Sequence, residues 1–257
     1  MLLARNNFLT YASMRNLKKS DKIKALADKE RLPISVVQLD VIDETSVRNA
    51  IQSIITETGK IDVLVNNAGY GLSGALEELT IDEIKTQFET NFYGLIRTTQ
   101  AVLPIMRKQK SGVVVNISSG AGRFGYPSGS AYVSTKFAVE GLSESISYEL
   151  EPFGIKVVLI EPGFVKTDFD RATISSKKSQ DPHSPYLQMM KKIDAASSMM
   201  AQNGCSPELV ASAVLEAVTS SSPNLRYLVG KDVEGWVKSK NSMSDAEFHQ
   251  MMAKGLS

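Results

Sequence analysis

Tyr132 and Lys136 are the pair of side chains in this sequence best suited to acid–base chemistry. They stand four positions apart, so on a helix both side chains lie on one face. A phenol with a pKa of about 10 is a poor general base near pH 7, and a nearby ammonium group favours the phenolate. Ser119, thirteen residues before Tyr132, could hydrogen-bond an oxygen that changes between hydroxyl and carbonyl. Taken alone, the Tyr-x-x-x-Lys spacing is more often a solvated helix face than a site.

Asn91 interrupts an apolar stripe of the helix expected after Thr80, between Phe88 and Leu95. A buried amide must find hydrogen-bond partners, which leaves two interpretations open. The amide could bond a helix backbone or a neighbouring strand, or it could hold a water molecule near the Tyr132 and Lys136 pair.

Short apolar runs rich in Val and Ile recur between helical patterns and predict buried parallel strands. These runs are Phe8 to Arg15, Ile34 to Val41, Ile61 to Ala68, Val113 to Ser119, Ile155 to Glu161 and Arg226 to Val229. The alternation predicts an α/β fold, a doubly wound, Rossmann-like parallel sheet with helices on both faces and ligands beyond the carboxyl ends of the strands.

Local signals place several helices. Residues 43–58 carry apolar side chains on one helical face, and Thr80 with Glu83 forms a capping-box signature for a helix running towards Lys108. Ser206 and Pro207 suit the start of a further helix, as N-cap and first-turn residues.

We expect residues 1–257 to form a single Rossmann-like domain. Residues 168–205 are polar and then Met-rich, which is long for a loop, so the segment is either a lid over the substrate or poorly ordered; we expect a lid. In that lid, Met189, Met190, Met199 and Met200, with Leu187 and Ile193, would give the cleft an apolar lining. Residues 231–257 are expected to form a C-terminal appendage, to which the sequence assigns no role.

Composition excludes several classes of protein. With 29 basic and 28 acidic side chains the net charge is +1, so no long-range field gathers nucleic acid. A single Cys205 and two histidines, His183 and His249, argue against disulfides and metal sites and suit a reducing, cytoplasmic location. No apolar run approaches the roughly 18 residues of a membrane span.

The chain lacks the glycine-rich turn that a dinucleotide fold uses to hold a pyrophosphate at a helix N-terminus. Two stretches match G-x-G-x-x-G, at Gly69 to Gly74 and at Gly120 to Gly125, but neither opens a helix. The first eight residues suggest the last turn of a helix that leads into the Phe8 to Arg15 strand. We therefore expect the fold's first strand and its glycine loop to lie upstream of Met1, which leaves the sheet without its first strand.

Several motifs together resemble the short-chain dehydrogenase/reductase family. They are Asn66-Asn67-Ala68-Gly69, Asn91, Asn116-Ile-Ser118-Ser119, Tyr132 with Lys136, and Pro162-Gly163-x-x-x-Thr167. Their order and spacing match the family from about Phe8 to Thr167. The wider sequence is similar to the branch that includes 17β-hydroxysteroid and retinol dehydrogenases.

The resemblance implies catalytic roles at four positions. Tyr132 would be the general acid/base, and Lys136 would lower its pKa and bond the nicotinamide ribose. Ser119 would orient the substrate oxygen, and Asn91 would hold a water in a proton relay from Lys136.

The resemblance also implies a cofactor site. Asn67, Ala68 and Gly69 would line the adenosine ribose, Asp40 and Val41 would flank the adenine, and Pro162, Gly163, Val165 and Thr167 would contact the nicotinamide end. Arg15 stands where NAD-preferring relatives usually carry an Asp, and it suits a 2′-phosphate, so NADP(H) is expected rather than NAD(H). The alternative is a solvent-exposed Arg15 without such a role.

The expected function is transfer of hydride between NADP(H) and the carbonyl or secondary-alcohol carbon of a small, hydrophobic substrate. Action on an acyl thioester stays open. The alternative is a cofactor-poor scaffold or pseudoenzyme that acts by binding partners. The family resemblance further implies a homodimer or homotetramer formed through the helices that carry Asn91 and Tyr132.

Overall fold

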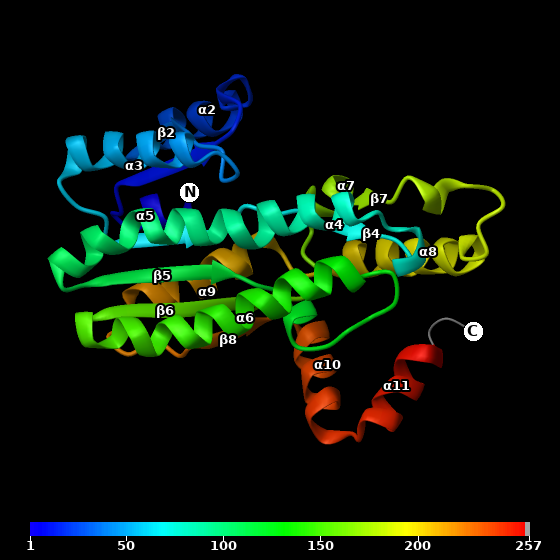
Figure 1. Ribbon diagram of the computed structural model, residues 1–257. Helices are drawn as coiled ribbons and strands as arrows, with labels where there is room; N and C mark the ends of the chain where they lie inside the picture. The colour runs from blue at the N-terminus through cyan, green and yellow to red at the C-terminus, as the bar shows by residue number, and fades with distance from the viewer. Residues whose placement is uncertain (255–257) are drawn as a thin grey trace.

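Strands and helices alternate along the chain, as Figure 1 shows. The computed structural model describes residues 1–254, without the side chains of residues 170 and 171. The strands are β1 (Thr10–Met14), β2 (Ile34–Gln38), β3 (Val63–Asn66), β4 (Leu72–Ser73), β5 (Gly112–Ile117), β6 (Ile155–Pro162), β7 (Ile174–Ser175) and β8 (Arg226–Val229). The six strands predicted from apolar runs are confirmed as β1, β2, β3, β5, β6 and β8, each within a few residues of its expected bounds.

Helices connect these strands. The α-helices are α1 (Leu2–Arg5), α2 (Asp21–Glu30), α3 (Glu44–Thr58), α4 (Ile81–Phe88), α5 (Gly94–Gln109), α6 (Ser130–Leu150), α7 (Phe169–Ala172), α8 (Leu187–Asn203), α9 (Pro207–Thr219), α10 (Lys231–Ser242) and α11 (Asp245–Lys254). A π-helical turn, η3 (Glu89–Tyr93), joins α4 to α5, and short 3-10 turns include η4 (Gly120–Gly122) and η6 (Lys178–Gln180).

Capping residues start the helices where the sequence predicts. Asp43 Oδ1 accepts hydrogen bonds from Thr45 and Ser46 N–H at the start of α3. Thr80 and Glu83 form the complete capping box of α4. The prediction of a helix running towards Lys108 is confirmed, with a π-helical turn, Glu89–Tyr93, inserted in its middle.

The core lies on both faces of a parallel sheet with the order β3-β5-β6-β8. Helices α3, α5 and α6 cover one face, where Val102 and Met106 are fully buried. Helix α9 covers the other face, where Val158 and Ala217 are fully buried. The central strands have apolar side chains on both faces, as expected for a parallel sheet between two helical layers.

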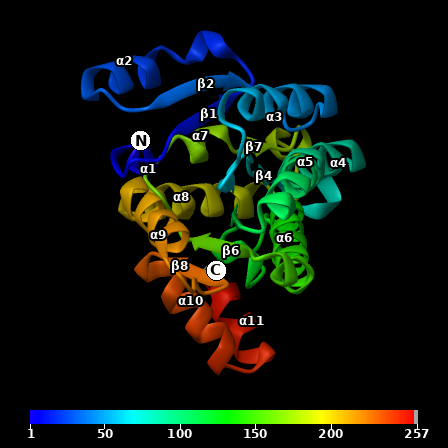
Figure 2. The same cartoon turned by 90° about the vertical axis from the view of Figure 1, so that its left-hand side faces the viewer.

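The sheet is interrupted between β3 and β1. Strand β1 pairs in parallel with β2 alone, and these two strands form a separate ribbon. In Figure 2 this ribbon lies above, while β6 and β8 of the main sheet lie below. The gap lies at the position expected for the missing first strand. The doubly wound fold is therefore present, but its sheet is divided.

The last helices are not peripheral. Helices α10 and α11 form a V-shaped pair beside the end of the main sheet (Figure 1). Phe248 of α11 and Val233 and Val237 of α10 pack with Phe124, which follows η4. These helices therefore border the loop that leads to Tyr132.

Candidate active site

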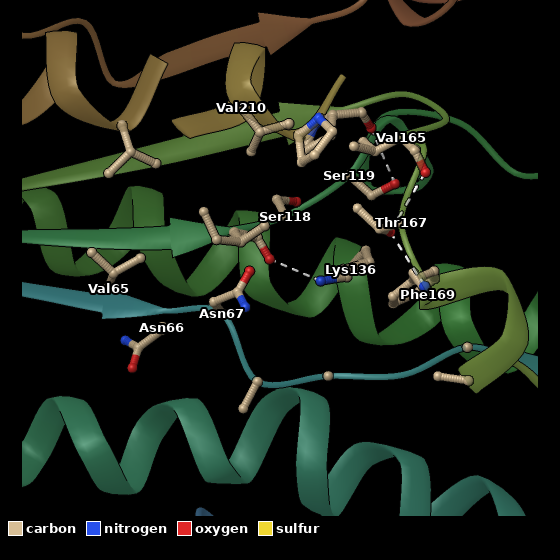
Figure 3. Close-up of a pocket in the computed structure, with 18 of the residues that line it drawn as sticks. Val65, Asn66, Asn67, Ser118, Ser119, Lys136, Val165, Thr167, Phe169 and Val210 are labelled. Carbon is tan, nitrogen blue, oxygen red and sulfur yellow. Dashed lines mark hydrogen bonds between the residues drawn. The ribbon is translucent and has the colours of Figure 1, made fainter. Parts of the chain in front are cut away.

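The carboxyl ends of β3, β5 and β6 meet at one edge of the sheet because the strands are parallel. A cavity of about 1840 Å³ opens there. Most of the site residues predicted from the sequence line it: Val41, Asn67, Ala68, Gly69, Ser119, Tyr132, Lys136, Pro162, Gly163, Val165 and Thr167. Figure 3 shows Ser119, Lys136 and Thr167 around this cavity, with Val65 and Asn66 of β3 along its wall. Asn91, Asp40 and Arg15 are outside the lining.

Tyr132 lies in the first turn of α6 and is only 9% exposed. Burial raises the pKa of Tyr132 to about 12, and a hydrogen bond with the Ser119 hydroxyl opposes this rise. The resemblance implies a pKa of Tyr132 lowered by Lys136, whereas the pKa is raised in this structure. The reason is that a phenolate in this enclosed position would lose its hydration, and this cost outweighs the other contributions.

Lys136 stands one helical turn beyond Tyr132, and its Nζ lies 5.6 Å from the centroid of the Tyr132 ring. The ammonium donates a hydrogen bond to the Ile117 carbonyl at the end of β5, at 2.8 Å. Burial lowers the pKa of Lys136 to about 8, and the negative charge of Glu140 opposes this change. The lysine is therefore held beneath the phenol by the strand end.

Asn91 is 2% exposed and lies in the π-helical turn. Its Oδ1 accepts from the Tyr70 N–H at 3.1 Å, and its Nδ2 donates to the Tyr70 carbonyl at 2.9 Å and to Thr135 Oγ1 at 3.3 Å. These bonds use the side-chain amide to fix the loop after β3 and to tie it to α6. The geometry fits the structural alternative, an amide bonded to neighbouring backbone.

The predicted adenine and ribose residues divide into two groups. The exposed loop Asn67 to Gly69 and the side chain of Val41 face the cavity. Asp40, in contrast, accepts a hydrogen bond from the Ile42 N–H at 3.2 Å and stabilises its own loop. Arg15 is exposed just past β1, beyond the cavity lining.

The loop after β6 is held by the C-terminal helices. Asp232 of α10 accepts a hydrogen bond from the Phe164 N–H at 2.8 Å, and its carboxylate would collide with any side chain at Gly163. Gly163 N–H donates to the Val229 carbonyl of β8 at 3.0 Å. The segment to which the sequence assigned no role therefore positions the loop that carries Pro162, Val165 and Thr167.

Residues 168–205 contain α7, β7, η6 and α8 and border the cavity through Phe169, Ile193 and Met200 among others. The expected lining by four methionines is wrong. Met199 is 61% exposed and Met190 is buried, and neither these two nor Met189 lines the cavity. Helix α8 therefore turns a different face to the cavity from the one that the Met pattern suggested.

Aromatic and Met side chains from distant segments form an apolar wall of the cavity. Phe124, Phe164 and Trp236 meet edge to face, with ring centroids 5.6 and 6.1 Å apart. Tyr126, Met251 and Met252 also line the cavity. Sequence reasoning missed this wall because residues 124–126, 164 and 236–252 are joined only by the tertiary fold.

A buried charged cluster, also missed, lies behind the site. Glu161, with no exposed surface, pairs with Arg123 at 3.1 Å, and Arg226 pairs with Glu140 at 3.0 Å. Burial and the neighbouring Glu140 raise the pKa of Glu161 to about 7, while Arg123 opposes the rise. Two features of the sequence could have indicated this cluster: the carboxylate of Glu161 inside an apolar strand, and the carboxylate of Glu140 one helical turn beyond Lys136.

The residues that line the cavity fit the nicotinamide end of a dinucleotide better than its pyrophosphate. Lys136, Tyr132 and Thr167 offer donors at one end of the cavity. In contrast, the Gly69 to Gly74 stretch contains the short strand β4, and Gly120 to Gly125 forms η4 and a turn. No glycine turn of the described chain opens an α-helix towards the cavity in the way a pyrophosphate requires.

No helix within residues 1–254 is long and apolar enough to cross a membrane. No group of His, Cys, Asp and Glu side chains in that part of the chain could hold a metal ion.

Comparison with known proteins agrees with the site. The family model for short chain dehydrogenases matches residues 1–178. A 3-ketodihydrosphingosine reductase of Bacteroides thetaiotaomicron is 40% identical over 216 residues, covering 82% of this chain and 79% of the relative. Human retinol dehydrogenase 8 is 34% identical over 229 residues, covering 86% and 72%. A short-chain dehydrogenase structure from Streptomyces avermitilis superposes with a TM-score of 0.81 at 31% identity, covering 96% and 87%.

The fold, the site and these similarities define a class of oxidoreductase that acts on alcohols and carbonyls. The chain belongs to the short-chain dehydrogenase family. The resemblance stated from the sequence is confirmed.

Proposed function

We propose that this chain transfers hydride between NADP(H) and the carbonyl or secondary-alcohol carbon of a small, hydrophobic substrate. The observation that carries the proposal is the buried Tyr132, which lines the same cavity as Ser119 at the sheet edge and has Lys136 one helical turn away. These three side chains line one cavity, so a substrate oxygen can reach two hydroxyls at once.

The side chains have distinct parts in the proposed reaction. A bound nicotinamide supplies hydride to the carbonyl carbon, or takes it from the alcohol carbon. In the reducing direction, the Tyr132 O–H bond breaks and its proton passes to the substrate oxygen, which becomes a hydroxyl. Because burial raises the pKa of Tyr132 to about 12, the phenol is protonated near pH 7 and ready to donate. The Lys136 ammonium stabilises the phenolate that remains, and Ser119 orients the substrate oxygen.

Residues around the cavity would hold the cofactor. Lys136, Val165 and Thr167 suit the nicotinamide and its ribose, with Pro162 and Gly163 shaping that end of the cavity, and Asn67 to Gly69 with Val41 suit the adenosine. Arg15 supports NADP(H), because its exposed guanidinium is able to pair with a 2′-phosphate. Asn91 acts as a positioning residue through its bonds to Tyr70.

The apolar wall supports a hydrophobic substrate. Phe124, Trp236 and the C-terminal methionines would contact its hydrocarbon part, while the Tyr132 hydroxyl meets its oxygen. The names of the Bacteroides keto-compound reductase and of retinol dehydrogenase 8 agree with such a substrate. Residues 168–205 would act as the lid over it.

The rival function is a cofactor-poor scaffold or pseudoenzyme that acts by binding partners. A fluorescence titration with NADPH separates the two. Saturable binding supports the oxidoreductase, and its absence supports the scaffold.

Tyr132→Phe tests the proton transfer. We expect turnover of hydrophobic ketones with NADPH to fall at least about 100-fold, since general acid catalysis contributes roughly 10²–10⁴, while NADPH binding is unchanged. Tyr148→Phe is the matched control, because Tyr148 lies on the same helix and is 67% exposed. If Tyr132→Phe retained most of the activity, the assigned role of the phenol would be wrong.

A further inference from the structure

Helix α6 carries a buried carboxylate directly behind the lysine of the candidate active site. Lys136 and Glu140 are four positions apart, so their side chains lie on one face of the helix. Lys136 is 8% exposed and Glu140 is 6% exposed, which places both charges away from bulk solvent. Lys136 therefore has Tyr132 one helical turn before it and the Glu140 carboxylate one turn after it.

The end of β5 and the turn η4 lie against these side chains. Lys136 Nζ donates a hydrogen bond to the Ile117 carbonyl at 2.8 Å (Figure 3). A Cβ atom at Gly122 would lie 2.9 Å from Ser118 Oγ and 3.2 Å from Glu140 Oε1. Because residue 122 is a glycine, the Glu140 carboxylate is able to approach the strand end that also holds Lys136.

The two oxygens of the Glu140 carboxylate have different surroundings. Oε2 accepts a hydrogen bond from Arg226 Nε at 3.0 Å. Oε1 is buried and has no hydrogen-bond partner among residues 1–254, and the same holds for the neighbouring Ser118 Oγ. A buried carboxylate oxygen without a hydrogen bond is costly unless positive charge lies near it. The Lys136 ammonium, on the same face of α6, supplies positive charge.

Charged side chains from four elements surround the Glu140 carboxylate. They are Lys136 and Glu144 of α6, Arg123 at the end of η4, Glu161 of β6 and Arg226 of β8. Arg226 also pairs with Glu144 at 2.6 Å. Burial and Glu140 together raise the pKa of Glu161 to about 7, so below that pH Glu161 takes up a proton. The negative charge that acts on Lys136 is that of Glu140.

Burial and Glu140 act on Lys136 in opposite directions. Burial lowers the pKa of Lys136 and the negative charge of Glu140 raises it, which leaves a value of about 8. Near pH 7 an amine with this pKa is mostly protonated. If the charge of Glu140 is removed, burial acts alone and a larger share of Lys136 becomes neutral at that pH.

We propose that Glu140 is a positioning residue whose carboxylate keeps the Lys136 amine protonated near neutral pH. The inference rests on the proposed function, in which charged Lys136 stabilises the phenolate that Tyr132 becomes when it gives its proton to the substrate. Glu140 is outside the cavity lining, so it acts through Lys136 and touches neither substrate nor cofactor. Successive turns of α6 then carry the proton donor, the cation and its counter-ion.

The first test measures the charge of Lys136 without substrate or cofactor. NMR of the whole protein, isotope-labelled at the lysine Cε atoms, follows the titration of Lys136, and Lys136→Met identifies its signal. Glu140→Gln has nearly the same shape without the charge and should lower the pKa of Lys136 by at least about one unit. Glu140→Met is also uncharged and similar in length and should do the same, and either variant is sufficient if the other does not fold.

Glu144→Gln is the matched control. Glu144 also pairs with Arg226, but it stands two helical turns beyond Lys136 and its side chain is 46% exposed. This variant should leave the titration of Lys136 unchanged. An unchanged pKa of Lys136 in the Glu140 variants, or an equal shift in Glu144→Gln, would overturn the inference.

The second test is the pH profile of ketone reduction with NADPH. Activity should fall as the pH rises through the pKa of Lys136, and Glu140→Gln should move this fall to lower pH by about one unit. A purely structural effect would lower activity at every pH without moving the fall, and that result would overturn the assigned role. If wild type reduces no ketone, the proposed function fails, and the NMR titration still decides whether Glu140 controls the charge of Lys136.

Discussion

Replacing Lys136 with methionine should make the folded protein more stable near pH 7. The lysine is 8% exposed, and burial lowers its pKa from 10.5 to about 8. At about 1.4 kcal/mol per pKa unit, that change corresponds to about 3 kcal/mol by which folding disfavours the charged amine. Methionine has a similar length and no charge, but it leaves the Ile117 carbonyl without its donor, at a cost of about 1 kcal/mol. The expected net gain in the free energy of unfolding is about 2 kcal/mol.

The gain should depend on pH. Between pH 8 and 10.5 the unfolded chain keeps a proton on Lys136 that the folded chain has lost, so wild-type stability rises with pH across that window. The methionine variant lacks this rise, so its advantage should shrink across the window and above it should become a deficit of about 1 kcal/mol, the cost of the lost hydrogen bond.

Urea denaturation near pH 7 and near pH 10 measures both effects. Lys238→Met, at an exposed position of α10, is the control and should change stability little at either pH. An Lys136→Met variant that is no more stable near pH 7, or whose advantage is the same at both pH values, would refute the reasoning.

Three further changes test separate parts of the site. Glu161→Gln should gain up to about 3 kcal/mol of stability relative to wild type as the pH rises from about 4.5 to about 7. The reason is that the raised pKa of Glu161 makes wild type lose stability across that window. Urea denaturation at these two pH values measures the difference, and a constant difference would contradict the prediction. Arg15→Ala should weaken NADPH about tenfold and leave NADH unchanged, and equal losses in binding titrations would remove the 2′-phosphate argument. Asn91→Ala should cost about 1–3 kcal/mol in urea denaturation, because the part-buried Tyr70 N–H loses its acceptor while the Tyr70 carbonyl keeps only the bond from Gln87; a loss below about 0.5 kcal/mol would contradict the bonds seen here.

Much of the fold could be predicted because its signals are local. Runs such as residues 113–117 and 155–161 are apolar on both faces, which only a central parallel strand requires. Asp43 and the Thr80 and Glu83 pair start helices through bonds that span two or three residues. The π-helical turn at Asn91 could not be predicted, because it depends on contacts with Tyr70 and Thr135 rather than on its own residues.

The candidate site was predictable for a similar reason. Helical periodicity alone puts Tyr132 and Lys136 on one face, and a parallel sheet alone brings the ends of β3, β5 and β6 together. The sequence by itself therefore determined which side chains gather at the sheet edge.

Only the tertiary structure decided how those side chains behave. The pKa of Tyr132 is raised rather than lowered, because desolvation depends on every atom packed around the phenol, including Phe169. The hydrogen bond from the Phe164 N–H to the Asp232 carboxylate, which positions the loop after β6, joins residues 68 positions apart. The hydrogen bonds within one strand or helix are determined by residues that are neighbours in the sequence. Burial and long-range contacts arise only when the layers pack against one another, so no local sequence pattern predicts them.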